Sequence, residues 1–173
     1  MPGRRFDFML LKSKIAYLGV LLGLNQLFII LSSVIETNTI ILFAAAALLV
    51  GVVIVEFGGK SGLLFYIASC LLGFFLSFNK FEFVTYVAFF GLYSYVKHLF
   101  ETKILNKTAL IFAKILFFNI ALFVMYTAIK AFISLKLTWW MILAAQVLFI
   151  IYDHAFSIFI SYYINNIKPK IKK

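Results

Sequence analysis

The chain alternates between six long apolar stretches and short segments that carry most of its polar and charged residues. The apolar stretches cover residues 15–35, 39–57, 61–78, 83–96, 108–135 and 138–164. About 20 apolar residues are enough for a helix to cross the hydrocarbon core of a bilayer. The runs are continuous rather than alternating in polarity, which is typical of helices and not of barrel strands. The pattern predicts an all-α integral membrane protein, a single domain of six transmembrane helices over residues 1–173.

The composition supports the bilayer as the solvent of this chain. Of its 173 residues, 65% are hydrophobic and 13% are charged, and the mean hydropathy is +1.08. Soluble domains are closer to about half apolar and about a quarter charged. A soluble protein of this length could not bury so much apolar surface. These values exclude a soluble protein and leave no room for a separate soluble domain.

Lysine and arginine are divided unequally between the two ends of the predicted helices. Thirteen of the sixteen basic residues lie on one side: Arg4, Arg5, Lys12, Lys14, Lys60, Lys97, Lys103, Lys107, Lys114, Lys168, Lys170, Lys172 and Lys173. The other three are Lys80, Lys130 and Lys136. Basic loops stay in the cytoplasm, so both termini are predicted to be cytoplasmic. The alternation holds only if the short stretch 83–96 also crosses, and the charge count therefore supports this span.

The net charge of +10 does not indicate a nucleic-acid partner, because the basic residues flank apolar runs and form no recognition motif. The expected partner is the lipid bilayer. The abundance of Lys, Ile, Phe and Asn over Arg is typical of an AT-rich bacterial genome. The predicted location is therefore the plasma membrane of a bacterium, which the chain crosses several times.

Small residues follow one face of the first predicted helix. Ala16, Gly19 and Gly23 are spaced by three and four residues, and Gln26 and Ser33 continue on the same side of the helix. Small residues let two helices approach closely within a membrane. Two interpretations are open: packing against another helix of this chain, and docking onto a partner subunit.

The last predicted helix carries an acidic residue inside its apolar stretch. Asp153 shares a helix face with Trp139 and Gln146, and His154 is its neighbour. A carboxylate at the centre of a membrane costs at least about 2.5–3.5 kcal/mol on insertion scales, so it needs a partner. Three roles are open: pairing with Lys114 or His154 as a structural lock, lining a substrate cavity, and relaying protons with His154.

Polar residues also follow one face of the fifth predicted helix. Asn119 and Tyr126 are seven residues apart, and Asn119 falls near the middle of the membrane. An amide at that depth must find an interhelical hydrogen bond, for which Asn25, Gln26 and Gln146 are candidates. The alternative to this structural role is contact with a ligand.

The usual signatures of catalysis are missing from the sequence. It contains no hydrolase elbow, no zinc-protease motif, no Walker ATPase motif and no pair of cysteines. Its two histidines, His98 and His154, are too few for a multi-histidine metal site. The chain is not expected to be an enzyme or to hold a cofactor or metal. Without an ATPase motif it cannot drive transport by itself.

The basic six-span architecture, with cytoplasmic ends and small residues on the first helix, resembles the S components of energy-coupling factor transporters. These are the substrate-capturing subunits of prokaryotic vitamin importers. In that family an Ala-x-x-x-Ala-like face on the first helix contacts a transmembrane coupling subunit, which works with separate ATPases. The resemblance implies that Gly19 and Gly23, with Ala16 one turn earlier, form this partner-docking face.

The same resemblance implies a small-molecule ligand in the outer half of the membrane. By position, the substrate-binding residues would be Asn119, Tyr126, Trp139 and Gln146. The first outer loop, residues 36–38, departs from the family because it is very short for a lid. The architecture also resembles rod-shape scaffold proteins of the MreD type, which transport nothing. The two expected functions are therefore substrate capture for a vitamin importer and a non-transporting membrane scaffold.

Overall fold

The computed structural model describes residues 3–131 and 138–171, with side chains from residue 14 to residue 170 in those ranges. All regular structure in the described residues is helical. The elements in chain order are α1 (Gly3–Val34), η1 (Glu36–Asn38), α2 (Thr39–Phe57), α3 (Gly59–Leu76), α4 (Lys80–Thr85), η2 (Tyr86–Phe90), α5 (Gly91–Lys103), α6 (Lys107–Lys130), α7 (Trp139–Tyr162), η3 (Tyr163–Ile167) and α8 (Lys168–Ile171). Because α4, η2 and α5 follow one another without a break, as do α7, η3 and α8, the described chain forms six long helices.

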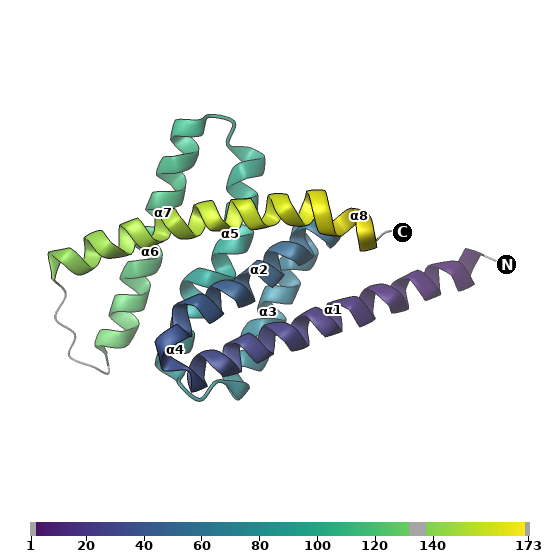
Figure 1. The fold of residues 1–173 in the computed structure, drawn as a ribbon, viewed down its shortest axis with the longest axis horizontal. Helices are drawn as coiled ribbons and strands as arrows, with labels where there is room; N and C mark the ends of the chain where they lie inside the picture. Colours follow the sequence, from purple (N-terminus) through teal and green to yellow (C-terminus); the bar gives the residue numbers. More distant parts are fainter. Residues whose placement is uncertain (1–2, 132–137, 172–173) are drawn as a thin grey trace.

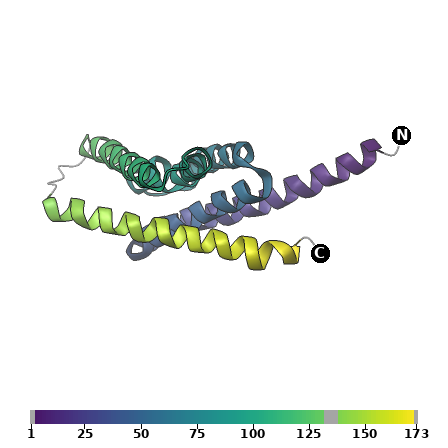
Figure 2. The same cartoon turned by 90° about the horizontal axis from the view of Figure 1, so that it is seen from above.

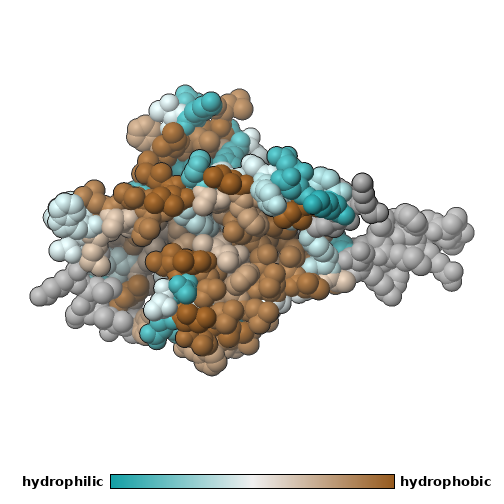
Figure 3. Space-filling view, viewed as in Figure 1, coloured by the Kyte–Doolittle hydropathy of each residue, from teal (hydrophilic) through white to brown (hydrophobic). Residues whose placement is uncertain are grey.

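Five of these helices are long and apolar enough to cross a membrane. They are Lys14–Val34, Glu36–Phe57, Gly59–Leu76, Lys107–Lys130 and Trp139–Lys170. Large apolar side chains stay exposed on their outer faces, as at Phe75, which is 80% exposed. Figure 3 shows this as a mostly hydrophobic surface, with hydrophilic residues gathered near the turn between α5 and α6 and near the end of the last helix. The chain is therefore a multi-pass helical membrane protein, as its hydrophobic pattern predicts.

The fourth helix is longer than the apolar stretch 83–96 from which it was predicted. It runs from Lys80 to Lys103, about 36 Å at 1.5 Å per residue, which is enough to cross the hydrocarbon core. Charged residues in α5 lower its hydropathy, and its middle part, η2, is a π-helical turn. A π turn breaks the regular ladder of backbone hydrogen bonds. Here the Tyr66 hydroxyl donates to the Val87 carbonyl at 2.7 Å, which satisfies one backbone acceptor of that turn.

Other predicted boundaries also differ from the observed ones, and the third stretch, 61–78, is shifted by two residues because α3 runs from Gly59 to Leu76. The first helix begins at Gly3 rather than at residue 15, and the last continues to Ile171 rather than ending at residue 164. Helix α6 ends at Lys130. Ala131 follows it in a turn, and residues 132–135 of the predicted stretch, together with Lys136 of the predicted outer side, lie outside the described residues.

Helix α1 begins and α8 ends on the same side of the molecule, at the right in Figures 1 and 2. Helix α7 runs across α5 and α6 in Figure 1 and lies in a different layer from them in Figure 2. Helix α7 therefore meets these two helices near the crossing instead of packing along their length.

A buried polar network joins the first three helices to η2. The Asn25 side chain donates to the Ala46 carbonyl at 2.8 Å and to the Tyr86 hydroxyl at 3.1 Å. Gln26 donates to the Ser69 carbonyl at 3.2 Å, and the Ser69 hydroxyl bonds to both Asn25 and Tyr86. A buried polar group without a partner is costly in a membrane. The network therefore fixes the relative positions of α1, α2, α3 and η2.

Cysteine labelling tests whether the fourth helix crosses the membrane. We expect Glu36→Cys, in η1, and Leu105→Cys, in the turn before α6, to lie on opposite sides when introduced into a Cys70→Ala chain. Both native side chains are exposed, and Leu105 is 96% exposed. A membrane-impermeant maleimide applied to intact cells should label the cysteine at position 36, and the one at position 105 only after permeabilisation. Labelling of both positions from outside would show that Lys80–Lys103 does not cross.

Candidate functional site

Four charged side chains join α5, α6 and α7 where these helices cross. The Asp153 carboxylate of α7 bonds to Lys97 of α5, and its two oxygens each lie 3.1 Å from the ammonium of Lys114 of α6. The Glu101 carboxylate lies 3.1 Å from the Lys97 ammonium and 2.8 Å from that of Lys114. The two positive and two negative charges cancel. We refer to Lys97, Glu101, Lys114 and Asp153 as the charged cluster.

Neutral hydroxyl groups complete the hydrogen bonding of the charged cluster. Tyr93 donates to Asp153 Oδ1 at 2.6 Å, and Lys97 donates to Ser157 Oγ at 2.9 Å. The Lys97 side chain is 4% exposed, whereas Glu101 is 41% exposed and forms the outer edge. An ionisable group within a membrane is expensive unless it is paired. The arrangement is thus suited to locking three helices together at one depth.

The structure brings together Lys114 and Asp153, two of the three residues proposed for a lock or a proton relay. His154, the third, is exposed, and no hydrogen bond or ion pair joins it to Asp153 among the described residues. Neighbouring residues on a helix point in directions about 100° apart, at 3.6 residues per turn. No hydrogen bond in the described structure therefore connects Asp153 directly with His154, so a proton has no direct path between them.

Sequence reasoning missed Lys97 and Tyr93 as partners of Asp153, and Glu101 as the carboxylate that pairs with both lysines. It placed Lys97 in an inner loop, because the apolar stretch ended at Val96. In the structure α5 continues to Lys103, so Lys97 and Glu101 share a helix face one turn apart. The spacing of four residues between a lysine and a glutamate was the signal that could have found this pair.

An apolar cleft runs beside the contact between α6 and α7, in which the Phe118 and Phe149 rings stack with their centroids 4.4 Å apart. One pocket, of about 420 Å³, lies between the second half of α6 and the first turns of α7. An adjoining pocket, of about 390 Å³, extends it toward α2 and η2. The residues common to both pockets are Thr85, Leu122, Met125 and Ala145. We call the two pockets together the α6–α7 cleft.

Three of the four predicted substrate-binding residues lie at or next to this cleft. Asn119 and Tyr126 line its first pocket. The Gln146 amide donates to Asn119 Oδ1 at 2.9 Å, so the interhelical partner of Asn119 lies on α7 and not on α1. Trp139 is 84% exposed and lines neither pocket. The helical spacing puts Trp139 on the same face of α7 as Gln146. The helix begins at Trp139, however, so this residue lies beyond the walls of the cleft.

The small-residue face predicted on the first helix is split in the structure. Ala16, Gly19 and Gly23 are exposed, and a Cβ added at either glycine would meet no heavy atom of the described residues within 4 Å. Gln26 and Ser33 instead turn toward α3, where the Ser33 hydroxyl lies 3.1 Å from that of Ser77. A groove of about 450 Å³ between α1 and α3 passes beside Gly19. The α1 face, Ala16–Gly19–Gly23, thus lacks close packing within the described chain.

The second half of α7 is held closely against α2. A Cβ at Gly51 would lie 2.8 Å from the Phe156 ring, so the glycine permits this close approach. Further along, Glu56 accepts a hydrogen bond from Tyr163 at 3.3 Å and pairs with Lys168 at 3.6 Å. Contacts of this kind fix the end of the last helix.

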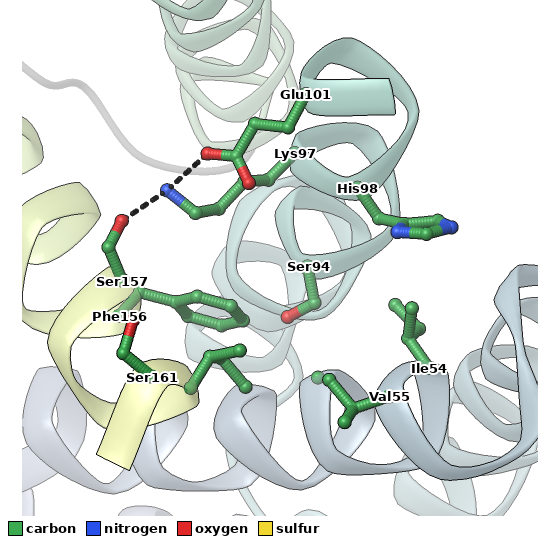
Figure 4. A pocket seen from close by; sticks show the side chains of 11 residues that line it. Ile54, Val55, Ser94, Lys97, His98, Glu101, Phe156, Ser157 and Ser161 are labelled. Carbon is green, nitrogen blue, oxygen red and sulfur yellow. Dashed lines mark hydrogen bonds and ion pairs between the residues drawn. The ribbon is translucent and has the colours of Figure 1, made fainter. Parts of the chain in front are cut away.

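A pocket of about 300 Å³ lies on the opposite side of the charged cluster from the α6–α7 cleft, between α2, α5 and α7. Figure 4 shows Lys97, Glu101 and Ser157 along one of its walls, with the Lys97 ammonium directed at the other two side chains. Ile54 and Val55 of α2 form the facing wall. This pocket gives the charged cluster a polar surface toward the ends of α5 and α7.

No group of three or more His, Cys, Asp or Glu side chains in the described part of the chain is arranged to hold a metal ion. In comparisons with known proteins, no family model, no curated protein and no solved structure matches the chain. The functional interpretation therefore rests on the geometry of the charged cluster, the α6–α7 cleft and the α1 face.

The charged cluster predicts different stability effects for two neighbouring residues. Asp153→Asn leaves two lysines facing Glu101 alone, so we expect the free energy of unfolding to fall by about 3–5 kcal/mol. His154→Asn changes an exposed side chain and should cost less than about 0.5 kcal/mol. Unfolding by sodium dodecyl sulfate in mixed micelles, followed by circular dichroism, measures both. Equal losses in the two variants would contradict the lock.

Proposed function

We propose that the chain is the substrate-capturing membrane subunit of a multi-subunit micronutrient importer of the energy-coupling factor type. The observation that carries the proposal is the asymmetry of α7. One face of α7, from Met141 to Ala155, borders an open cleft, whereas Asp153 on another face ties the helix to α5 and α6. The distribution of basic residues assigns the end of the cleft at Met141–Ala145 to the predicted outer half of the membrane. A capture subunit needs this combination of an open outer pocket and a closed inner path.

The size and lining of the cleft support a small-molecule ligand. Pockets of this class typically enclose about 300–1,000 Å³ and combine apolar walls with a few polar groups. The pocket next to the first turns of α7 has a volume of about 420 Å³ and is mainly apolar, with Thr85, Asn119 and Tyr126 as its polar members. Gln146 holds Asn119 from across the cleft, so this amide is positioned before any ligand binds.

Transport by this subunit would need energy from a separate protein, since the sequence carries no ATPase motif. The α1 face is the proposed docking surface for a transmembrane coupling subunit with separate ATPases. Its two glycines have no neighbour within 4 Å of a Cβ position, which would let a partner helix approach closely. This support is independent of the cleft, because α1 takes no part in lining it.

A non-transporting scaffold of the MreD type is the second candidate. The α1 face favours it as well, because a scaffold also needs a protein-binding surface. A scaffold needs no ligand, and in that case the α6–α7 cleft would hold only bilayer lipid. The nature of the partner distinguishes the two candidates.

Bulky substitutions on the α1 face test the proposal. We expect Ala16→Phe and Gly23→Phe to reduce capture of a coupling subunit and its ATPases by at least about tenfold, because the added rings prevent close helix packing. The measurement is affinity capture of the tagged full chain from membranes of its native host, with quantitative mass spectrometry. Ala144→Phe adds the same bulk at an exposed position of α7 and is the matched control.

If the chain is an importer subunit, the unchanged chain and the Ala144→Phe control should both capture ATPase subunits. Capture of a stable partner without any ATPase would overturn the importer and support the scaffold. Capture that is equal in all variants would remove the α1 face as the docking surface.

A further inference from the structure

The α6–α7 cleft is long as well as apolar. Its lining on α7 extends from Met141 to Ala155, about 21 Å at 1.5 Å per residue. Aromatic and aliphatic side chains form most of its walls, including Phe89, Phe118 and Phe149. A compact polar molecule would leave most of this surface without contact. An extended apolar chain would cover it.

The cleft is open at its sides toward the surrounding bilayer. Several of its lining residues are also exposed at the surface, among them Phe123 (67%), Leu148 (54%) and Ile151 (59%). An apolar chain can therefore enter the cleft from the hydrocarbon core without crossing water. A closed binding pocket would not combine lining and exposure in the same side chains.

A positive charge lies beside one end of the cleft. Lys130 is exposed in the last turn of α6, and its ammonium lies 5.4 Å from the centroid of the Tyr126 ring, which lines the cleft. No carboxylate is paired with Lys130 among the residues that the structure describes. By the distribution of basic residues, this end faces the outer interface of the membrane. An anionic group there would be attracted to Lys130 while its apolar chain stays in the cleft.

We propose that the α6–α7 cleft binds an amphiphile with a single apolar chain and an anionic head, admitted sideways from the outer leaflet. The chain lies in the cleft, along the face of α7 that carries Ala145 and Leu148, and the head lies at Lys130. This inference rests on the proposed function and names the substrate class of its binding site. A fatty acid and a lysophospholipid with an anionic head share this chemistry, and they serve as separate probes.

Photolabelling tests the inference in the full chain, reconstituted in phosphatidylcholine nanodiscs. The probe is a fatty acid with a diazirine in its chain, and mass spectrometry locates the labelled residues. We expect saturable labelling of Leu122, Met125 and Ala145. Excess palmitate or lysophosphatidate should compete with the probe, and the stronger competitor identifies the head group. Hexadecanol, with the same chain and no charge, should compete at least about threefold less well, as expected for one exposed charge.

Two neighbouring alanines provide a matched pair of variants. Ala145 lines both pockets of the cleft, whereas Ala144 is exposed on another face of α7. Ala145→Phe should reduce labelling of the cleft by about tenfold or more, and Ala144→Phe should leave it unchanged. If Ala145→Phe lowers helicity or unfolds at lower detergent strength, Leu122→Phe fills the same space from α6. In the Lys130→Gln variant, palmitate and hexadecanol should compete about equally well, since the positive charge that favours palmitate is lost.

Several outcomes would overturn the inference. Labelling spread over the exposed faces of α1 and α3, unaffected by Ala145→Phe or Leu122→Phe, would mean annular lipid only. Equal competition by palmitate and hexadecanol would refute the anionic head. Capture of ATPase subunits without cleft labelling would reject the inference and leave the proposed function standing. Cleft labelling without any ATPase partner would reject the importer and retain the amphiphile site.

Discussion

A charge-neutral group of four ionisable side chains within a membrane protein is the constraint on which this structure depends. Asp153 meets Lys97 and Lys114 from two other helices, and Glu101 balances the second lysine. A membrane offers no water to replace a missing partner, so removal of one charged member leaves an unbalanced charge on the others. The helices α5, α6 and α7 must therefore cross at the depth where these charges meet.

The asymmetry of the last helix follows from this crossing. Beyond Asp153, α7 is held against α2 by the close approach at Gly51 and by the Glu56–Lys168 ion pair. Before Asp153, α7 meets α6 through the Gln146–Asn119 hydrogen bond and through the stacked rings of Phe118 and Phe149, whose centroids are 4.4 Å apart. That half of α7 borders the α6–α7 cleft. The fold thus combines one half of α7 that is packed closely on α2 with another half that borders an apolar cleft.

The helical membrane fold was predictable because continuous apolar runs and uneven basic loops have direct physical causes. Gln146 was one of the expected partners of Asn119, because an amide in the hydrocarbon core needs a hydrogen-bond partner. Hydropathy alone ended the fourth span at Val96 and excluded Lys97 from it. The charge of Lys97 is balanced by Asp153, which lies on another helix and is distant in the sequence. Helical spacing also put Trp139 and His154 near functional groups, but spacing does not show where a helix begins or which neighbour a side chain meets.

A double-mutant cycle between Lys114 and Asp153 tests the central role of the charged cluster most directly. Lys114→Met, Asp153→Asn and the double variant are compared with the unchanged chain by unfolding in mixed micelles. If the cluster locks the crossing, the two residues should show a coupling free energy of about 1–3 kcal/mol, with the double variant less destabilised than the sum of the single ones. Additive losses, with coupling near zero, would contradict the account.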